Sequence, residues 1–366
     1  MLAILTGLAL LALAGLAWLI GDGLYAIVRR RRSAAARRPR RLQVISRREV
    51  GDELLCLELA DPRRRQLPAF AAGQHVLLTA PTGQNGQPIR RAYSLAAWTA
   101  RPERYELGIK REAQGAMTQW LWQHLQVGDS IEVSPAQGDF VIAPGTTPLV
   151  LIAGGIGITP LRAMAQAALG SGRAILLFQQ ARRSDGLLYH DEFATLAAKH
   201  ANFHYLPRLS RPAADWAGET GRLDAQRVLA ELSTAPPAEF YLCAGNAMLG
   251  SLEHGLLAQG IAKRQIHREV FSAGTESGQI GLNLTVDRPG TSKTVISAGE
   301  PTVLATLEAN AIAVSAECRA GSCGQCVATL HHGAIDWLVE PEFKVGPRQF
   351  LPCVCAARSD LGLGLA

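Results

Sequence analysis

Three cysteines lie within nine residues near the C-terminal end of the chain, in the segment CRAGSCGQC. Cys318, Cys323 and Cys326 are separated by four and then two residues, and further thiols follow at Cys353 and Cys355. This is the spacing with which a loop supplies thiolates to a plant-type 2Fe-2S cluster. A zinc site, the alternative, requires a second close CxxC or CxxH pair, which the sequence lacks. The pattern therefore favours a 2Fe-2S centre.

A glycine-rich turn provides a second place for chemistry, the binding of a nucleotide phosphate. The stretch LVLIAGGIGITPLRAMAQAALG begins as a buried strand and breaks at Gly154, Gly155 and Gly157. We expect a helix to follow, with Thr159 as its N-cap and Pro160 in its first turn. Glycines let a phosphate approach the backbone, and a helix start offers free amides. The third glycine of GxGxxG is missing, so this signal alone is weak.

A third group of residues lies upstream, in the segments RRAYSLA and GAMTQWLWQHL. Arg91 could hold a phosphate, Tyr93 could stack on a flat ring, and Gly115 stands at the mouth of the one evident helix in this region. Taken singly, an Arg-x-Tyr on a strand is more often a solvated charge beside a half-buried aromatic residue. These residues acquire meaning only together with the other two groups.

Three kinds of domain must position these residues. Residues 42–142 read as short alternating strands with little helix, which predicts an antiparallel β-barrel. Residues 143–275 alternate apolar strands with helices, which predicts an α/β parallel sheet with ligands at the carboxyl ends of its strands, where the glycine turn and Cys243 lie. Residues 278–366 combine strand-like and helical runs, IGLNLTVDRPG and PTVLATLEANAI, in an α+β domain. The fold class is therefore multidomain.

The N-terminal segment differs from the rest of the chain. Leu2 to Ile20 is an uncharged run of nineteen residues, long enough for a transmembrane helix. Arginines crowd residues 29–41 directly after it, which predicts a single-pass anchor over residues 1–28 and a basic linker over residues 29–41. A cleaved secretory signal would carry its positive charge before the apolar run. We therefore expect the protein at the inner (cytoplasmic) membrane, with its catalytic domains in the cytoplasm.

The positive charge of the chain belongs to this strip. Residues 1–41 hold eight arginines and one aspartate, and the whole chain has a formal net charge of +6, so the remainder is close to neutral. Charge confined to a juxtamembrane strip is explained by topology and by attraction to the lipid bilayer. A nucleic acid is therefore not an expected partner.

Taken in order, these motifs resemble a known family. The segment Arg91 to Ser94, the pair Gly115 and Thr118, the GGIGITP turn, Cys243 and the triplet EVF that begins at Glu269 resemble the ferredoxin-reductase superfamily. The C-terminal domain resembles a β-grasp ferredoxin. Residues 42–366 are thus similar to single-chain NAD(P)H reductases of bacterial oxygenases, of the phthalate-dioxygenase-reductase and phenylacetate-epoxidase-reductase types. The resemblance does not cover the predicted membrane anchor.

The resemblance implies roles for individual residues. It implies that Ser94, Cys243 and Glu269 act around the flavin and the nicotinamide. It implies that the flavin and the nucleotide are bound by Arg91, Tyr93, Ser94, Gly115, Met117, Thr118, Gly154, Gly155, Gly157, Thr159, Ser210, Arg211 and Phe271. It implies that the cluster ligands are Cys318, Cys323, Cys326 and Cys353.

Two details qualify these roles. The distant ligand of the family follows a leucine by two positions, as Cys353 follows Leu351, so Cys355 is expected to be a packed thiol. The family's Cys-Gly-Pro turn is replaced here by Cys-Ala-Gly, starting at Cys243, which puts the shape of that turn in doubt. None of the nine histidines is given a ligand role; surface or packing positions are the simplest reading.

The function implied is a membrane-anchored reductase that passes electrons from NAD(P)H through a flavin to a 2Fe-2S cluster and on to a membrane-bound oxygenase or desaturase. FAD is expected and FMN is the alternative; NADPH is slightly favoured over NADH because Ser210 and Arg211 resemble a pair that holds a 2′-phosphate. Two other functions stay open. One is an electron-input subunit of a respiratory membrane complex, although the sodium-pumping example has the opposite domain order. The other is a 2Fe-2S redox sensor, which would not need a nucleotide pocket.

Overall fold

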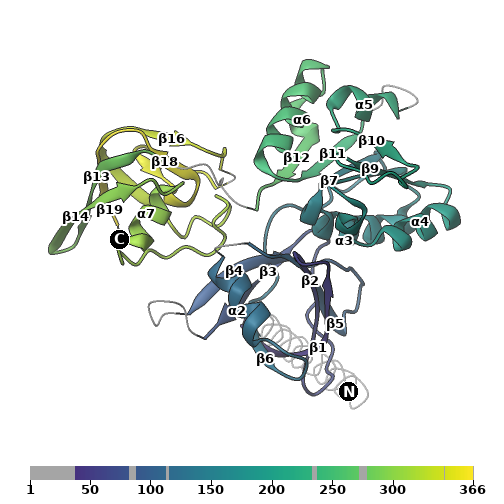
Figure 1. The fold of residues 1–366 in the computed structure, drawn as a ribbon, viewed down its shortest axis with the longest axis horizontal. Coiled ribbons are helices and arrows are strands. Elements are labelled where there is room, and N and C mark those ends of the chain that lie inside the picture. Colours follow the sequence, from purple (N-terminus) through teal and green to yellow (C-terminus); the bar gives the residue numbers. More distant parts are fainter. Residues whose placement is uncertain are drawn as a thin grey trace, which may run out of the picture.

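The computed structural model describes residues 38–81, 88–112, 115–232, 237–271, 278–341 and 343–365. Three domains follow one another along the chain and meet near the centre of the molecule (Figure 1). The predicted membrane anchor, residues 1–28, and most of the basic linker lie outside the described residues. Within the described ranges, no helix has the length and apolar character needed to cross a membrane.

The first domain, the barrel domain, is an antiparallel sheet with one helix. Its elements are β1 (Arg40–Val50), β2 (Leu54–Ala60), β3 (His75–Ala80), β4 (Ile89–Ser94), β5 (Arg104–Lys110), α2 (Ala116–His124) and β6 (Ser130–Val133). The strands lie in the order β4-β3-β6-β1-β2-β5, and every pairing is antiparallel. An isolated bridge between Leu95, the residue after β4, and Leu107 of β5 connects the two edges of the sheet and closes the predicted barrel. Alternate leucines of β2, such as Leu57, are buried in its interior.

The second domain, the parallel-sheet domain, has the predicted alternation of strands and helices. Its strands are β7 (Leu149–Gly154), β8 (Ile175–Ala181), β9 (Phe203–Leu209), β10 (Glu219–Thr220), β11 (Glu239–Cys243) and β12 (Ile266–Glu269). Its helices are α3 (Ile158–Ala168), α4 (His190–Lys199), α5 (Ala225–Ala230) and α6 (Asn246–Ala258), with short 3₁₀ turns η1 (Gly155–Gly157), η2 (Leu169–Ser171), η3 (Ser184–Gly186) and η4 (Lys263–Gln265). The strand order is β10-β9-β8-β7-β11-β12, and all pairings are parallel.

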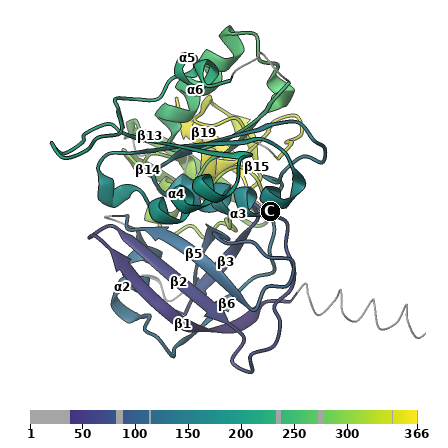
Figure 2. The same ribbon diagram turned by 90° about the vertical axis from the view of Figure 1, so that its right-hand side faces the viewer.

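Both faces of this sheet are covered, which explains its continuous apolar strands. Leu149 and Leu151 of β7 pack in the core that contains α3 and α4. Val150 and Ile152 pack in the core that contains α5 and α6. Figure 2 shows α3 and α4 lying toward the barrel domain. The carboxyl end of β7 is thereby directed to the junction of the domains.

The start of α3 corrects one sequence expectation. Thr159 was expected to be the N-cap, but the N-cap is Gly157, and Thr159 lies inside the first turn. The 3₁₀ turn η1 runs straight into the helix, so the backbone is already helical before Thr159 is reached. The Thr159 hydroxyl donates instead to the carbonyl of Ile156, at 2.9 Å.

The third domain, the C-terminal domain, has the predicted α+β composition. Its strands are β13 (Ile280–Arg288), β14 (Thr291–Ala298), β15 (Ala328–His332), β16 (Ile335–Trp337), β17 (Gln349–Phe350), β18 (Cys355–Ala357) and β19 (Leu361–Gly364), with helix α7 (Val303–Ala309) and the turn η5 (Pro352–Val354). A five-stranded sheet in the order β14-β13-β19-β15-β17 has a parallel pair, β13 and β19, between antiparallel neighbours. Leu304 and Leu307 of α7 are buried.

Charged contacts join the domains. Arg162 of α3 donates to Glu106 of the barrel domain at 2.8 Å and to the Ala96 carbonyl at 2.9 Å, and it also pairs with Glu192 of α4 at 2.9 Å. The C-terminal domain contributes Glu340, which approaches Arg268 of the parallel-sheet domain at 3.3 Å. An apolar cluster adds to this contact, because residues of α6 and of the cysteine-bearing segments share one core.

Candidate active site

A cavity of about 330 Å³ lies where the three domains meet, and residues of all three line it. The barrel domain supplies β4 and the start of α2. The parallel-sheet domain supplies the glycine turn, residues 154–159, and the end of β12. The C-terminal domain supplies the cysteine loop, residues 318–326. Ten of the residues singled out in the sequence line it: Arg91, Tyr93, Ser94, Gly115, Met117, Thr118, Thr159, Glu269, Phe271 and Cys318. The fold thus brings together three motifs that are far apart in the sequence.

The barrel side of the cavity has the features expected of a flavin site. Burial raises the pKa of Tyr93, so its phenol stays neutral and its ring can lie against another flat ring. Gly115 caps α2 without a side-chain bond, and the Thr118 hydroxyl donates to the Gly115 carbonyl at 3.0 Å. A Cβ on Gly115 would lie 2.6 Å from that hydroxyl oxygen. The helix start therefore stays open, as an approaching phosphate requires.

Of the three predicted catalytic residues, Ser94 and Cys243 both approach the carboxylate of the third, Glu269. The Ser94 hydroxyl donates to Oε2 of Glu269 at 3.3 Å, and the Cys243 thiol lies 4.0 Å from the same oxygen. Cys243 is fully buried and does not itself line the cavity. Burial, with a smaller contribution from Glu269, raises the pKa of Cys243, so the group beside the carboxylate is a neutral thiol. Glu269 thus connects the barrel domain to the end of β11.

A histidine that sequence reasoning left among surface and packing residues belongs to this site. His75 lines the cavity, and its backbone lies opposite Ser94 in the β3–β4 pair. Its Nδ1 is 3.9 Å from Oε1 of Glu269, and its buried Nε2 has no hydrogen-bond partner among the described residues. Burial lowers its pKa, which favours the neutral ring. A histidine at the start of a barrel strand carries no local signal of this position.

The glycine turn is held against the end of the neighbouring strand. A Cβ on Gly157 would lie 1.9 Å from the carbonyl oxygen of Cys243, so only glycine permits this approach. Gly155 has a φ of +56°, in the left-handed region that glycine tolerates. Gly154, Gly155 and Gly157, which the sequence predicted to bind the nucleotide, do not line the cavity, whereas Ile156 and Thr159 do.

Two of the predicted nucleotide residues lie elsewhere. Ser210 and Arg211 follow β9, at the same carboxyl edge of the sheet as the glycine turn, but they do not line the cavity. Their amides donate to the carbonyls of Ala181 and Arg182 at 3.0 and 2.9 Å, and Arg211 is exposed.

The C-terminal domain brings four thiols together: those of Cys318, Cys323 and Cys326 in the cysteine loop, residues 318–326, and that of Cys353 in η5. Hydrogen bonds from Cys323 and Cys353 lower the pKa of Cys318, and a hydrogen bond from Cys353 lowers the pKa of Cys326. The amides of Ala320 and Cys323 point at the Cys318 sulfur, at 3.5 and 3.4 Å, as donors to a cluster sulfur would.

The loop backbone explains its glycines. Gly321 and Gly324 have φ values of +79° and +71°, as expected where the backbone must wrap inward. No three His, Cys, Asp or Glu side chains of the described ranges surround one point as ligands of a single metal ion would. Cys318 contacts Cys323 and Cys353, and Cys353 also contacts Cys326, so contacts between neighbours link the four thiols.

Cys355 is the packed thiol that the sequence predicted. Its side chain is fully buried, and burial raises its pKa to about 12. Its backbone pairs with Trp337 in the small sheet formed by β16 and β18.

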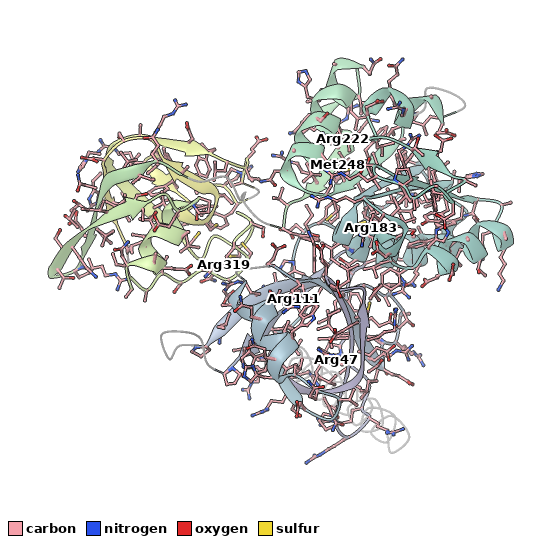
Figure 3. All side chains as sticks on the ribbon, viewed as in Figure 1. Arg47, Arg111, Arg183, Arg222, Met248 and Arg319 are labelled. Carbon is pink, nitrogen blue, oxygen red and sulfur yellow. The ribbon has the colours of Figure 1, made fainter. Side chains whose placement is uncertain are left out.

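Of the four predicted cluster ligands, Cys318 lines the cavity, so the flavin side of the molecule faces this sulfur. Arg319, the next residue, also lines the cavity and was not foreseen (Figure 3).

Comparison with known proteins first defines the class. The family model of the oxidoreductase FAD-binding domain matches residues 41–142, that of the oxidoreductase NAD-binding domain matches residues 151–254, and that of the 2Fe-2S iron-sulfur cluster binding domain matches residues 286–358. These matches fall in turn on the barrel, parallel-sheet and C-terminal domains. The chain is an oxidoreductase with FAD-binding, NAD-binding and 2Fe-2S domains.

Relatives along nearly the whole chain then define the family. The chain is 30% identical over 345 residues to the phenoxybenzoate dioxygenase subunit beta of Ectopseudomonas oleovorans, covering 91% of this chain and 99% of that one. It is 26% identical over 326 residues to phthalate dioxygenase reductase of Burkholderia cepacia, covering 87% and 95%. A solved structure of phthalate dioxygenase reductase matches with a TM-score of 0.65 at 25% identity, over 89% of this chain and 98% of that one. The chain belongs to the ferredoxin-reductase superfamily.

Proposed function

We propose that the protein takes electrons from NAD(P)H at the cavity and delivers them, through a 2Fe-2S cluster held by the cysteine loop, to a partner oxygenase or desaturase in the membrane. The observation that carries this proposal is the single cavity lined by the flavin motif, by Glu269 and by Cys318. A bound flavin accepts two electrons as a hydride and releases them singly to iron, which is chemistry that the cofactor supplies. The chain supplies position and environment.

Different residues position the flavin ring, its phosphate and the nicotinamide. Tyr93 presents a neutral aromatic face to the flavin ring, while Arg91 and the start of α2 face its phosphate. Ser94 and Cys243 are held by the Glu269 carboxylate, which fixes the place where the nicotinamide and the flavin ring meet. The neutral state of Cys243 keeps a second negative charge away from this meeting point. No acid–base triad is required for hydride transfer.

The cluster ligands are Cys318, Cys323, Cys326 and Cys353. Amide donors to the Cys318 sulfur favour the reduced, more negative state of a bound cluster. Because Cys318 faces the cavity, electrons enter the cluster on this side.

Support for an oxygenase as the acceptor comes from relatives named for dioxygenase systems. Support for a membrane-bound acceptor comes from the apolar run Leu2 to Ile20 alone.

The test is an anaerobic titration of the purified protein with NADH and, separately, with NADPH, following the flavin and cluster absorption bands. We expect the flavin band to bleach first and the cluster band to follow. Ser210 and Arg211 at the carboxyl edge lead us to expect that NADPH reduces the protein at lower concentration than NADH. A protein whose flavin neither nucleotide bleaches would contradict the proposal, whereas a preference for NADH would contradict only the role of these two residues.

A further inference from the structure

Two arginines from different domains line the same cavity. Arg91 lies on β4 of the barrel domain, and Arg319 directly follows Cys318 in the C-terminal domain. Figure 3 shows Arg319 where the C-terminal domain faces the barrel. Burial, and to a smaller extent the neighbouring Arg319, lower the pKa of Arg91 to about 10. The Glu308 carboxylate, which is paired with Arg319, offsets part of the repulsion between the two guanidinium groups, and an anion bound in the cavity would offset more of it.

The Glu308 carboxylate orients Arg319, whose Nε has no hydrogen-bond partner among the described residues. Its Nη1 donates to Oε2 of Glu308 at 2.8 Å, and its Nη2 donates to Oε1 of the same carboxylate. Its Nε is buried. Arg319 also has a φ of +55°, a conformation that non-glycine residues rarely adopt.

The barrel domain provides other anion-binding groups at the same cavity. The Arg91 Nη1 donates to the carbonyl of Arg90 at 2.8 Å, which uses one of its five N–H donors. Gly115 leaves the start of the nine-residue helix α2 without a side-chain cap. A phosphate beside the helix start would compensate both the helix dipole and the paired guanidinium groups.

We propose that Arg319 binds the flavin phosphate together with Arg91, so that the cofactor itself joins the C-terminal domain to the barrel domain. This rests on the proposed function, in which a flavin occupies the cavity. Glu308 is then a positioning residue that holds Arg319 in place. Because linkage is reciprocal, flavin binding strengthens the docking of the cluster-bearing domain, and docking strengthens flavin binding.

The test compares two flavins that differ in phosphate. Full-length protein is freed of flavin, and the dissociation constants of FAD and of riboflavin, which has no phosphate, are measured for wild type, R319Q and E308Q. We expect R319Q to weaken FAD binding roughly tenfold or more, as loss of a charge-assisted hydrogen bond does, and to leave riboflavin binding unchanged. E308Q keeps the cation but removes the carboxylate that positions it, so it should weaken FAD binding less than R319Q does and should also leave riboflavin binding unchanged.

Several outcomes would overturn the inference. Unchanged FAD binding in R319Q, equal losses for FAD and riboflavin, or equal losses in R319Q and E308Q would show that Arg319 only shapes the cysteine loop. Acid-labile sulfide content reports whether each variant assembles its cluster. If R319Q does not assemble its cluster, R319K takes its place in the test, because lysine keeps the positive charge on the loop. The ratio of FAD affinity to riboflavin affinity in R319K must then fall by less than about tenfold. If the wild type binds neither flavin, the proposed function fails instead.

Discussion

At the scale of single residues, two cysteines only two positions apart have different surroundings. Cys353 contacts Cys318 and Cys326, whereas Cys355 turns into the core of the C-terminal domain. The 3₁₀ turn η5 ends between them, and the strand β18 that follows directs Cys355 to the opposite side. Their roles are therefore separable by substitution.

We expect Cys353→Ser to abolish the 2Fe-2S cluster, because one of four thiolates is lost, and Cys355→Ser to retain it. Cys355→Ser should still cost stability, on the order of 1–3 kcal/mol, because a hydroxyl replaces a buried thiol. Acid-labile sulfide and visible absorption measure the cluster, and thermal unfolding measures the stability. Loss of the cluster in both variants, or retention in Cys353→Ser, would refute the assignment.

The cluster ligands are predicted from the sequence alone because their spacing is local, and the structure brings the four thiols together. The flavin residues of β4 were predicted because a short motif carries them. His75 and Arg319 could not be predicted in the same way, because their proximity to the cavity depends on how the domains meet. Their types alone, a histidine on a strand and an arginine in a loop, are more often surface residues.

At the scale of elements, the glycine turn depends on one close approach. The parallel sheet was predictable because strands buried on both faces are continuously apolar. The start of α3 was not, since the 3₁₀ turn η1 that replaces a side-chain cap has no sequence signature. What the sequence did show was a glycine, Gly157, in the turn after β7 that approaches the end of β11.

We expect Gly157→Ala to weaken nucleotide binding and to destabilise the parallel-sheet domain by about 1–3 kcal/mol, because its Cβ would overlap the Cys243 carbonyl. Gly250, inside α6, is the matched control: a Cβ there meets nothing within 4 Å. Gly250→Ala should stabilise the helix by up to about 1 kcal/mol. Thermal unfolding and NADPH titration separate the two variants, and equal behaviour would contradict the close-approach argument.

At the scale of the whole molecule, Arg162 of α3 joins the parallel-sheet domain to the barrel domain through Glu106, and it also pairs with Glu192 of α4 in its own domain. Its side chain is 10% exposed, and Tyr189 stacks on it at 4.2 Å. Arg162→Met would leave Glu106 and Glu192 without their buried counter-charge.

We expect this substitution to destabilise the protein by about 3–5 kcal/mol, as loss of one partner of a buried ion pair does. The control is Arg227→Met: Arg227 and Asp224 are each 51% exposed, so its loss should cost below about 1 kcal/mol. Thermal unfolding of both variants makes the comparison. Similar shifts for the two would show that the domain contact does not depend on Arg162.

The proposed membrane anchor has its own test at this scale. Deletion of residues 1–28 should leave NADPH-driven reduction of soluble dyes unchanged, because the three domains are retained. Delivery of electrons to a membrane-bound acceptor should fall, because tethering raises the effective concentration of the two proteins. Assays with dye and with isolated membranes compare the two activities, and an equal loss of both would count against the anchor.

The apolar cluster shared by the parallel-sheet domain and the cysteine-bearing segments has a consequence for the life of the protein in a cell. Val339 and Leu351 lie in the same core as helix α6. We expect a copy made during iron shortage, which lacks the cluster, to pack these segments less tightly and so to present apolar surface to chaperones and proteases. Iron supply would then govern how many copies survive, which pulse-chase turnover in iron-poor and iron-rich medium can measure.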